Sequence, residues 1–288
     1  MLVYIDGQFY DEKDAKVSVF DHGLLYGDGV FEGVRAYNGR VFKLSEHIKR
    51  LYDSAKAIML KVLISESEMI ESVLEALRKN NLKDGYIRIL ITRGEGSLGI
   101  DPITCARSSV IIIADSLNLY PEEFYETGLA IISASVRRNS PDVVNPKIKS
   151  LNYINNIMAK IEARQAGVLE AIMLDRNGYV CECTGDNIFI VKNGVIKTPP
   201  VYLGVLKGIT RDFVIEIARD LGYIFQEEIM TQYDIYTADE CFLTGTAAEA
   251  IPVVMADSRE ISNGNVGEVT KSIIKEFRLR VAQEGWEI

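Results

Sequence analysis

Two lysines lie at a place in the sequence that suits covalent chemistry with a carbonyl compound. Lys147 and Lys149 belong to the segment NPKIKSLNYINN, immediately before a helix expected over about 152–166. A lysine amine forms a Schiff base with an aldehyde when nearby positive charge or partial burial keeps the amine unprotonated. Most lysines are ordinary exposed residues. By their chemistry alone, the two are equal candidates.

A carboxylate follows in a strand that is otherwise apolar. Glu182 lies in the segment YVCECT, and strand alternation places it on one face with Val180 and Thr184. A carboxylate in such a strand needs a partner or an exposed edge. A pyridinium nitrogen would be such a partner, because the carboxylate keeps the ring protonated and makes it an electron sink. The plainer alternative is a glutamate that faces water on an edge strand.

Two segments have the composition of an anion site. The residues LKGITR at 206–211 place a glycine and Thr210 at the start of an expected helix, and GTAA at 245–248 follows an expected strand. Backbone amides at such turns, together with a threonine hydroxyl, bind phosphate or carboxylate. Thr210 could instead be an ordinary helix cap. Arg50 lies on the polar face of a helix that we expect to start at Ser45, facing either water or a cleft.

Composition excludes several other classes of protein. The chain has 288 residues, 48% apolar and 25% charged, with a net charge of −9, whereas proteins that bind nucleic acid usually carry a basic surplus. Two histidines and a C-x-C cysteine spacing do not fit a metal centre. The longest purely aliphatic run, 110–114, is far too short to span a membrane, and the N-terminus lacks a signal-peptide pattern. We therefore expect a soluble, cytoplasmic protein without metal, membrane or nucleic-acid partners.

The order of the expected elements indicates an α+β or α/β protein of two domains. The first half has strands, two helices and then further strands, whereas residues 115–128 break the periodicity with Asn, Pro, acidic residues and Gly. We expect a small N-terminal α/β domain over 1–117 and an interdomain linker over 118–128. A large C-terminal domain over 129–288 would carry the lysine.

Taken together and in this order, these segments resemble the branched-chain amino acid aminotransferases. The resemblance covers nearly the whole chain. The stretches that carry it are DHGLLYGDGVFEGVRAY at 21–37, KSLNY at 149–153, ECTGDNIF at 182–189, GITR at 208–211 and TGTAAE at 244–249. It implies the fold-type-IV architecture of the pyridoxal 5′-phosphate (PLP) enzymes, like that of the D-amino-acid aminotransferases, with PLP in the cleft between the domains.

The resemblance also implies a role for each matching residue. Lys149, and not Lys147, would form the Schiff base with PLP. The other cofactor-binding residues would be Arg50, Tyr153, Glu182, Ile209, Thr210 and Thr246. The α-carboxylate of the substrate would be received by Tyr86, Thr246 and Ala247, and Arg88 would support the side-chain carboxylate of glutamate. The remaining substrate-binding residues would be Tyr26, Phe31, Arg35, Leu98 and Tyr120, with 98–100 reaching into a neighbouring subunit of a homodimer or larger homo-oligomer.

The implied reaction moves an amino group between branched-chain L-amino acids (Leu, Ile, Val) and 2-oxoglutarate, with Lys149 transferring the Cα proton. A D-amino-acid aminotransferase would carry Arg and His in the loop where this chain has Leu98 and Ile100. An aminodeoxychorismate lyase would need polar pocket walls, whereas this chain offers aromatic ones. A PLP-binding scaffold without activity is a third alternative, which the joint presence of Lys149, Glu182 and both anion segments disfavours.

Overall fold

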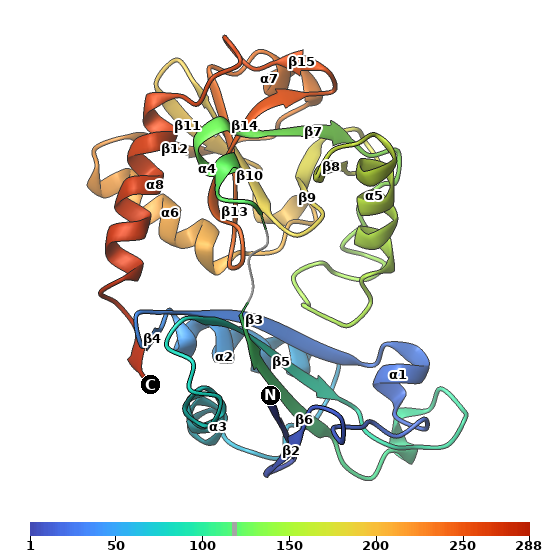
Figure 1. Ribbon diagram of the computed structural model, residues 1–288. Coiled ribbons are helices and arrows are strands. Elements are labelled where there is room, and N and C mark those ends of the chain that lie inside the picture. The colour runs from blue at the N-terminus through green and yellow to red at the C-terminus, as the bar shows by residue number, and fades with distance from the viewer. Residues whose placement is uncertain (117–119) are drawn as a thin grey trace. The chain divides into compact units, whose positions relative to one another are not determined.

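The computed structural model describes residues 1–116 and 120–288, which form two compact units (Figure 1). Unit 1 comprises Met1–Leu117, Ile148–Asn152 and Val281–Ile288, and unit 2 comprises Asn118–Lys147 and Tyr153–Arg280. None of the helices within the described ranges combines the length and the apolar character needed to cross a membrane.

In the described chain, unit 1 is built on an antiparallel sheet of seven strands in the order β16-β4-β3-β5-β6-β1-β2. These strands are β1 (Leu2–Ile5), β2 (Gln8–Asp11), β3 (Gly29–Tyr37), β4 (Arg40–Val41), β5 (Gly85–Thr92), β6 (Ser109–Asp115) and β16 (Trp286–Glu287). The helices are α1 (His22–Tyr26), α2 (Leu44–Ala57) and α3 (Glu66–Lys79), with a 3-10 turn, η1 (Pro102–Thr104).

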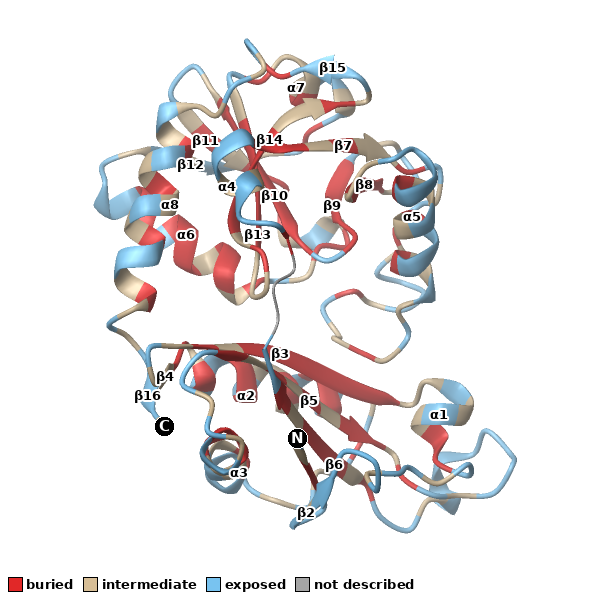
Figure 2. Cartoon of the chain, in the orientation of Figure 1, coloured by how far each residue is buried: buried red, intermediate tan, exposed pale blue. Residues whose placement is uncertain are grey.

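The two faces of the sheet in unit 1 differ because strand side chains alternate. On one face, Val30 and Val34 of β3 join Ile87, Ile89 and Ile91 of β5 in a core that also contains the apolar residues of α2 and α3. Figure 2 shows β3 and β5 as largely buried, and Figure 1 shows both helices against this sheet. The alternate residues of the two strands face the other way and include two aromatic residues, Phe31 and Tyr86, and two cationic ones, Arg35 and Arg88.

Local sequence signals account for the helix starts only in part. At α3 the segment Ser65-x-x-Glu68 forms a capping box, a pattern that the sequence itself contains: Ser65 accepts from the Glu68 amide, and the Glu68 side chain accepts from the Ser65 amide. The expected start of α2 at Ser45 is wrong. The N-cap is Lys43, in the left-handed conformation (φ 48°) and without a side-chain cap bond. The Ser45 hydroxyl instead accepts a 3.0 Å hydrogen bond from Trp286 Nε1.

The described part of unit 2 contains a nine-stranded sheet in the order β12-β11-β10-β13-β14-β7-β8-β9, with β15 paired to β14. Its strands are β7 (Leu129–Ser133), β8 (Glu170–Leu174), β9 (Val180–Cys183), β10 (Asn187–Lys192), β11 (Val195–Thr198), β12 (Ile224–Glu227), β13 (Glu240–Gly245), β14 (Glu249–Ala256) and β15 (Arg259–Glu260). Its helices are α4 (Glu123–Thr127), α5 (Ile154–Gln165), α6 (Ile209–Asp220), α7 (Gln232–Tyr236) and α8 (Glu268–Val281), with a 3-10 turn, η2 (Val201–Leu203).

The strands of unit 2 form its core. Every residue of β8 and β9 is buried, as are all residues of β10 except the last (Figure 2). Helix α5 packs on β8, and α6 packs on β12 and β13. The positions that concern the site therefore lie at the ends of buried strands and at the start of α6, where neighbouring elements hold them in place.

The units differ from the domains expected from the sequence in three places, one of which is the C-terminal segment Val281–Ile288, which belongs to unit 1 rather than to the C-terminal domain. The expected boundary at 117/118 lies outside the described residues. The described part of the expected linker, 120–128, packs into unit 2, because Tyr120, Phe124 and Tyr125 contribute to its apolar core. Residues 148–152, expected in the C-terminal domain, belong to unit 1 because their backbone pairs with β3.

Candidate active site

Lys149 lies in a short extended segment that runs alongside β3. The Phe31 amide donates to the Lys149 carbonyl, and the Leu151 amide donates to the Gly29 carbonyl, both at 2.9 Å. The Lys149 side chain is half-buried, and its Nζ lies 4.6 Å from the centroid of the Phe31 ring. Lys147 is exposed and belongs to unit 2. The two lysines therefore have different surroundings, and only Lys149 is placed by a strand and an aromatic ring.

The face of β3 and β5 that carries Phe31 is aromatic and cationic. The Arg88 guanidinium carbon lies 4.6 Å from the centroid of the Phe31 ring and 5.5 Å from that of Tyr86. Arg35 is the cross-strand neighbour of Tyr86. Gly33, two residues before Arg35 on β3, leaves room for the Tyr86 hydroxyl. A Cβ at Gly33 would lie 2.0 Å from that oxygen. The sequence-predicted residues Phe31, Arg35, Tyr86 and Arg88 thus meet on one surface.

On the opposite face of β3, a buried carboxylate holds Arg50. Glu32 accepts from Arg50 Nε at 2.6 Å and Nη2 at 2.9 Å, and it contacts His47 Nδ1 at 2.8 Å. Burial alone would raise the pKa of Glu32, but the Arg50 and His47 charges and hydrogen bonds outweigh it and hold that pKa well below its usual range. Burial also lowers the pKa of His47, against the opposing effect of Glu32. Arg50 is therefore oriented by an ionised partner.

Tyr26 and Leu98 lie together in the loops of unit 1. The Tyr26 hydroxyl donates to the Leu98 carbonyl, and the Tyr26 ring contacts His22 edge-on, with centroids 5.1 Å apart. His22 Nε2 lies 2.8 Å from the Ser97 carbonyl oxygen. Both Tyr26 and Leu98 are exposed, at 38% and 68%. Together they form an outward surface at the loop end of unit 1.

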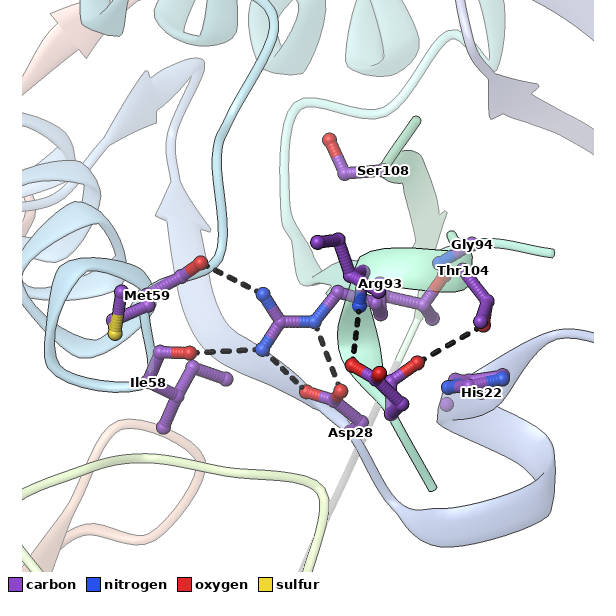
Figure 3. Close-up of polar contacts among 12 residues, drawn as sticks. His22, Asp28, Ile58, Met59, Arg93, Gly94, Thr104 and Ser108 are labelled. Carbon is purple, nitrogen blue, oxygen red and sulfur yellow. Dashed lines mark hydrogen bonds and ion pairs between the residues drawn. The ribbon is translucent and has the colours of Figure 1, made fainter. Parts of the chain in front are cut away.

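A half-buried ion pair fixes these loops to the segment that follows α2. Arg93 donates from Nε and Nη2 to the two oxygens of Asp28, each at 2.9 Å, and Figure 3 shows this fork. The remaining donors of Arg93 reach the carbonyls of Met59 and Ile58 at 2.7 and 2.8 Å, beyond the end of α2. Such a bidentate pair is geometrically specific. It holds the segment from α1 to β3, which carries Tyr26 and leads into Phe31.

In unit 2, Glu182 is buried rather than exposed on an edge. Its Oε1 accepts from Arg138 Nη2 at 2.6 Å, and its Oε2 accepts from Asn187 Nδ2 at 3.1 Å and from the Leu206 amide at 3.0 Å. Hydrogen bonds to a carboxylate and a nearby cation both favour its charged form. The arrangement therefore holds an ionised carboxylate in one orientation.

Asn187 connects Glu182 to the start of α6. Its Nδ2 also donates to the Leu206 carbonyl at 3.0 Å. Its Oδ1 lies where a side chain at position 208 would have to be, because a Cβ added to Gly208 would be 2.1 Å from that oxygen. Gly208 is the N-cap of α6 and makes no side-chain cap bond, so Thr210 is the second helical residue rather than the cap. The first amides of a helix have no partner within it. Ile209 and Thr210 therefore present amides suited to an anion.

The second anion segment is the turn between β13 and β14. Thr246 and Ala247 are half-buried in this turn. Just before it, the Thr244 hydroxyl is buried and has no hydrogen-bond partner within the described chain. Thr244 is the cross-strand neighbour of Asn187. An orphaned hydroxyl next to the residue that positions Glu182 is consistent with a ligand that brings polar groups to this end of the sheet.

Tyr120, expected on a pocket wall, is buried in unit 2. It is 5% exposed and belongs to the apolar core of unit 2. Its hydroxyl lies 3.1 Å from Asp186 Oδ2 and 3.3 Å from Glu170 Oε2. Its ring is enclosed and its hydroxyl is engaged with buried carboxyl groups, and its expected role in substrate binding stays a prediction. Tyr153, also expected at the cofactor, is half-buried at the N-cap of α5.

The residues of the two units provide the groups that a phosphorylated pyridine aldehyde requires. Unit 1 offers an amine on Lys149 and an oriented guanidinium on Arg50. Unit 2 offers a carboxylate for a ring nitrogen on Glu182 and helix amides for a phosphate. Sequence reasoning missed Glu32, Arg138 and Asn187, which orient these groups. For Glu32 a signal was present, since an acid between Val30 and Val34 in an alternating strand requires a buried partner.

Comparison with known proteins agrees with this set of groups. The family model of amino-transferase class IV matches residues 29–255. A relative in Methanocaldococcus jannaschii, assigned to the branched-chain-amino-acid aminotransferases, is 57% identical over 278 residues, which cover 96% of each chain.

Solved structures give the same result. The branched-chain amino acid aminotransferase of Escherichia coli is 38% identical, with a TM-score of 0.96 and coverage of 99% of this chain and 95% of that one. The T.th. branched-chain amino acid aminotransferase, complexed with N-(5′-phosphopyridoxyl)-L-glutamate, is 39% identical, with a TM-score of 0.92 and coverage of 98% and 94%. The expected fold-type-IV architecture is confirmed. The chain belongs to the class IV aminotransferases and, within them, to the branched-chain-amino-acid aminotransferases.

Proposed function

We propose that this chain transfers the amino group between branched-chain L-amino acids and 2-oxoglutarate, with PLP bound covalently to Lys149. The observation that carries the proposal is the pairing of the Lys149 segment with β3, which places Nζ over the Phe31 ring beside Arg88 and Tyr86. One surface of unit 1 thus holds a reactive amine, an apolar wall and a cation for a carboxylate.

The proposed role of Lys149 has two parts. Its Nζ bonds to the cofactor and is later displaced by the amino acid. The freed amine would then take the proton from the substrate Cα and deliver it to the former aldehyde carbon of the cofactor, and in the second half-reaction it would move a proton in the opposite direction. PLP, when bound, supplies the aldehyde carbon and the electron-withdrawing ring. The protein supplies the position of the amine, which two backbone hydrogen bonds to β3 and one from its own amide to Ser54 Oγ restrain.

The cofactor-binding roles divide between phosphate and ring. Arg50, oriented by Glu32, would bind the phosphate together with the amides of Ile209 and Thr210 and the Thr246 hydroxyl. Glu182 would accept from the protonated ring nitrogen, because its donors hold the carboxylate ionised and in one orientation. Tyr153 would hydrogen-bond the phenolic oxygen of the ring.

The substrate roles follow from the aromatic and cationic face of unit 1. Phe31 would contact the apolar side chain of leucine, isoleucine or valine. Tyr86, with Thr246 and Ala247, would receive the α-carboxylate, and Arg88 would receive the second carboxylate of glutamate. Arg35, the cross-strand neighbour of Tyr86, would support that tyrosine. The same surface would therefore accept the apolar side chain of the branched-chain amino acid in one half-reaction and the acidic side chain of glutamate in the other.

Tyr26 and Leu98 act as one surface in this proposal, because a hydrogen bond joins them. Both are exposed and their loops are fixed to unit 1. We propose that they complete the substrate pocket of a neighbouring copy of the chain, so that the active enzyme is at least a homodimer.

Analytical ultracentrifugation of the wild type should show a dimer or larger species. Leu98→Asp should lose affinity for leucine while its Lys149 still binds the cofactor, and a fully active monomer would contradict the proposal.

Covalent labelling by the cofactor tests the role of Lys149. Purified protein incubated with PLP and reduced with borohydride should carry the cofactor on Lys149, as peptide mass spectrometry would show. Lys149→Ala should lose both the label and the turnover of L-leucine with 2-oxoglutarate. Lys147→Ala is the matched control, two residues away and exposed, and should keep both. Residual label on Lys149→Ala at wild-type level contradicts the proposal.

A substrate panel tests the reaction class. L-leucine, L-isoleucine, L-valine and D-alanine are each supplied with 2-oxoglutarate, and glutamate formation is measured. The branched-chain L-amino acids should be turned over at least tenfold faster than D-alanine, a difference of about 1.4 kcal/mol in transition-state binding. A preference for D-alanine would assign the chain to the D-amino-acid aminotransferases instead.

A further inference from the structure

A buried cluster of ionisable groups lies in unit 2 beside the turn that joins β13 to β14. Asp186, which precedes β10, and Glu170, which begins β8, are 5% and 1% exposed. The Tyr120 hydroxyl lies between them, 3.1 Å from Asp186 Oδ2 and 3.3 Å from Glu170 Oε2. Burial and both carboxyl groups raise the pKa of Tyr120 above its usual value, so it stays protonated. A phenol has one proton and donates fully to one acceptor at a time.

The two carboxyl groups are not equally supplied with donors. Glu170 Oε1 accepts from the amides of Ala171 and Thr184 at 2.8 and 2.9 Å, and its Oε2 accepts from Lys160 Nζ at 2.9 Å. The Asp186 side chain, within the described residues, contacts only the Tyr120 hydroxyl by hydrogen bonding. Glu170 thus accepts hydrogen bonds from a cation and two amides. Over the part of the chain that the structure describes, the Asp186 carboxyl group has a single hydrogen-bond donor, the Tyr120 hydroxyl.

Asp186 lies directly against the turn. Its Oδ1 would be 2.0 Å from a Cβ at Gly245, so the carboxyl group occupies the space that any side chain there would need. The next two residues are Thr246 and Ala247. Whatever charge Asp186 carries is therefore felt by the backbone and hydroxyl groups of this turn.

The surroundings of Asp186 raise the pKa of its carboxyl group. Burial and the Glu170 carboxylate raise its pKa to about 7, against the opposing effects of Tyr120 and Lys160. Burial and the neighbouring acids raise the pKa of the Cys183 thiol well above its usual value, so that thiol is neutral. The groups that face Asp186 from the elements packed around it are Tyr120, Lys160 of α5, Glu170 of β8, and Glu182 and Cys183 of β9. Lys160 is the cation among them, and it is bound to Glu170.

We infer that Asp186 is a positioning residue of the Thr246–Ala247 turn, held as the neutral acid so that no negative charge lies beside the site of the substrate carboxylate. The inference rests on the proposed function, in which this turn receives that carboxylate. In the neutral state, Asp186 donates to the Tyr120 oxygen and Tyr120 donates to Glu170, so the chain of groups is satisfied. Loss of the proton places an anion next to an anion site, where exclusion of water strengthens the repulsion.

The direction of the pH dependence follows. The folded-state pKa of Asp186 is raised above the value of about 3.9 for an unfolded chain. The stabilisation by the neutral form is therefore complete below about pH 4 and is lost as pH rises through about 7. Affinity for a carboxylate at the turn should fall as pH rises through about 7.

Binding of 4-methylvaleric acid, which is leucine without its amino group, tests this. Calorimetry on the cofactor-loaded protein, from about pH 6 to about pH 8.5, should show the Kd of wild type rising by roughly tenfold. Asp186→Asn keeps the shape and neutrality of the acid and should remove the part of this rise that belongs to residue 186. Glu268→Gln, an exposed carboxylate of α8 with 87% of its side chain accessible, is the matched control and should behave like wild type. An equal rise in Asp186→Asn and wild type would overturn the inference.

A second measurement reports the proton itself. Infrared difference spectra of the cofactor-loaded protein at about pH 6 should contain a carboxylic-acid carbonyl band in wild type and Glu268→Gln that is missing in Asp186→Asn. Absence of that difference overturns the neutral acid, whatever reaction the chain performs. If 4-methylvaleric acid fails to bind at every pH while Lys149 carries the cofactor, the carboxylate role of the turn is overturned, and the chemistry of Lys149 is not.

Discussion

Glu32 and Arg50 form a bidentate ion pair across the interface between β3 and α2, with Nε and Nη2 donating at 2.6 and 2.9 Å. The glutamate is fully buried, and the arginine side chain is 15% exposed. A planar guanidinium held at two points has one orientation. Strand β3 therefore has two roles. One face carries Phe31, and the other carries Glu32, which orients Arg50, the residue proposed to bind the phosphate.

Glu32→Gln should raise the Kd of PLP by a larger factor than it lowers kcat. The amide keeps the shape of the carboxylate but loses its charge and one acceptor, so Arg50 is held less firmly. We expect the Kd of PLP to rise by roughly tenfold, with kcat at saturating cofactor changing less. Absorbance titration of the cofactor-free protein measures the Kd. Glu46→Gln, on the exposed side of α2, should leave it unchanged. A lowered kcat with an unaltered Kd would contradict this role.

Arg138→Gln should affect both stability and the cofactor ring. Arg138 donates at 2.6 Å to Glu182, and both side chains are less than a tenth exposed. Removing one partner of a buried pair costs roughly 3 kcal/mol of unfolding free energy. The remaining carboxylate should also take up a proton more readily, which would shift the absorbance of bound PLP. Urea unfolding and cofactor spectra check both effects. The adjacent Arg137 is exposed, and Arg137→Gln should change neither.

The element types were largely predictable because they depend on local patterns. Alternation in β5 and β6, the capping box of α3 and the Asn-Gly turns all act within a few residues of the chain. At Asn38-Gly39 and Asn193-Gly194 both residues have positive φ, as a two-residue hairpin turn requires. The start of α2 was mispredicted because Ser45 is occupied by Trp286, 241 residues away, a contact that no local signal contains.

The candidate residues of the proposed site could be predicted from the sequence, but the residues that orient them could not. Lys149, Arg50 and Glu182 stood out by residue type within recognisable segments. What separates Lys149 from Lys147 is a backbone pairing with β3, which lies far away in the sequence. The burial of Tyr120 was not predictable for the same reason: its ring packs into an apolar core formed by distant strands. Tertiary contacts of this kind leave no periodicity for a sequence pattern to report.

Gly33→Ala should impair substrate binding while leaving the cofactor in place. A Cβ at Gly33 would lie 2.0 Å from the Tyr86 hydroxyl and 2.7 Å from its Cζ, so the ring of Tyr86 must leave its present position beside Arg88. We expect KM for L-leucine and for 2-oxoglutarate to rise by about tenfold or more, because displacement of a positioning group by an ångström is costly. The borohydride-reducible cofactor on Lys149 should be retained. Gly185→Ala, where an added Cβ meets nothing within 4 Å, is the matched control. In the double variant with Tyr86→Phe, removal of the nearest clashing atom should recover part of the binding of both substrates, because both have the α-carboxylate assigned to Tyr86. A double variant that binds both substrates no better than Gly33→Ala would show that the Tyr86 hydroxyl is not the atom that Gly33 accommodates.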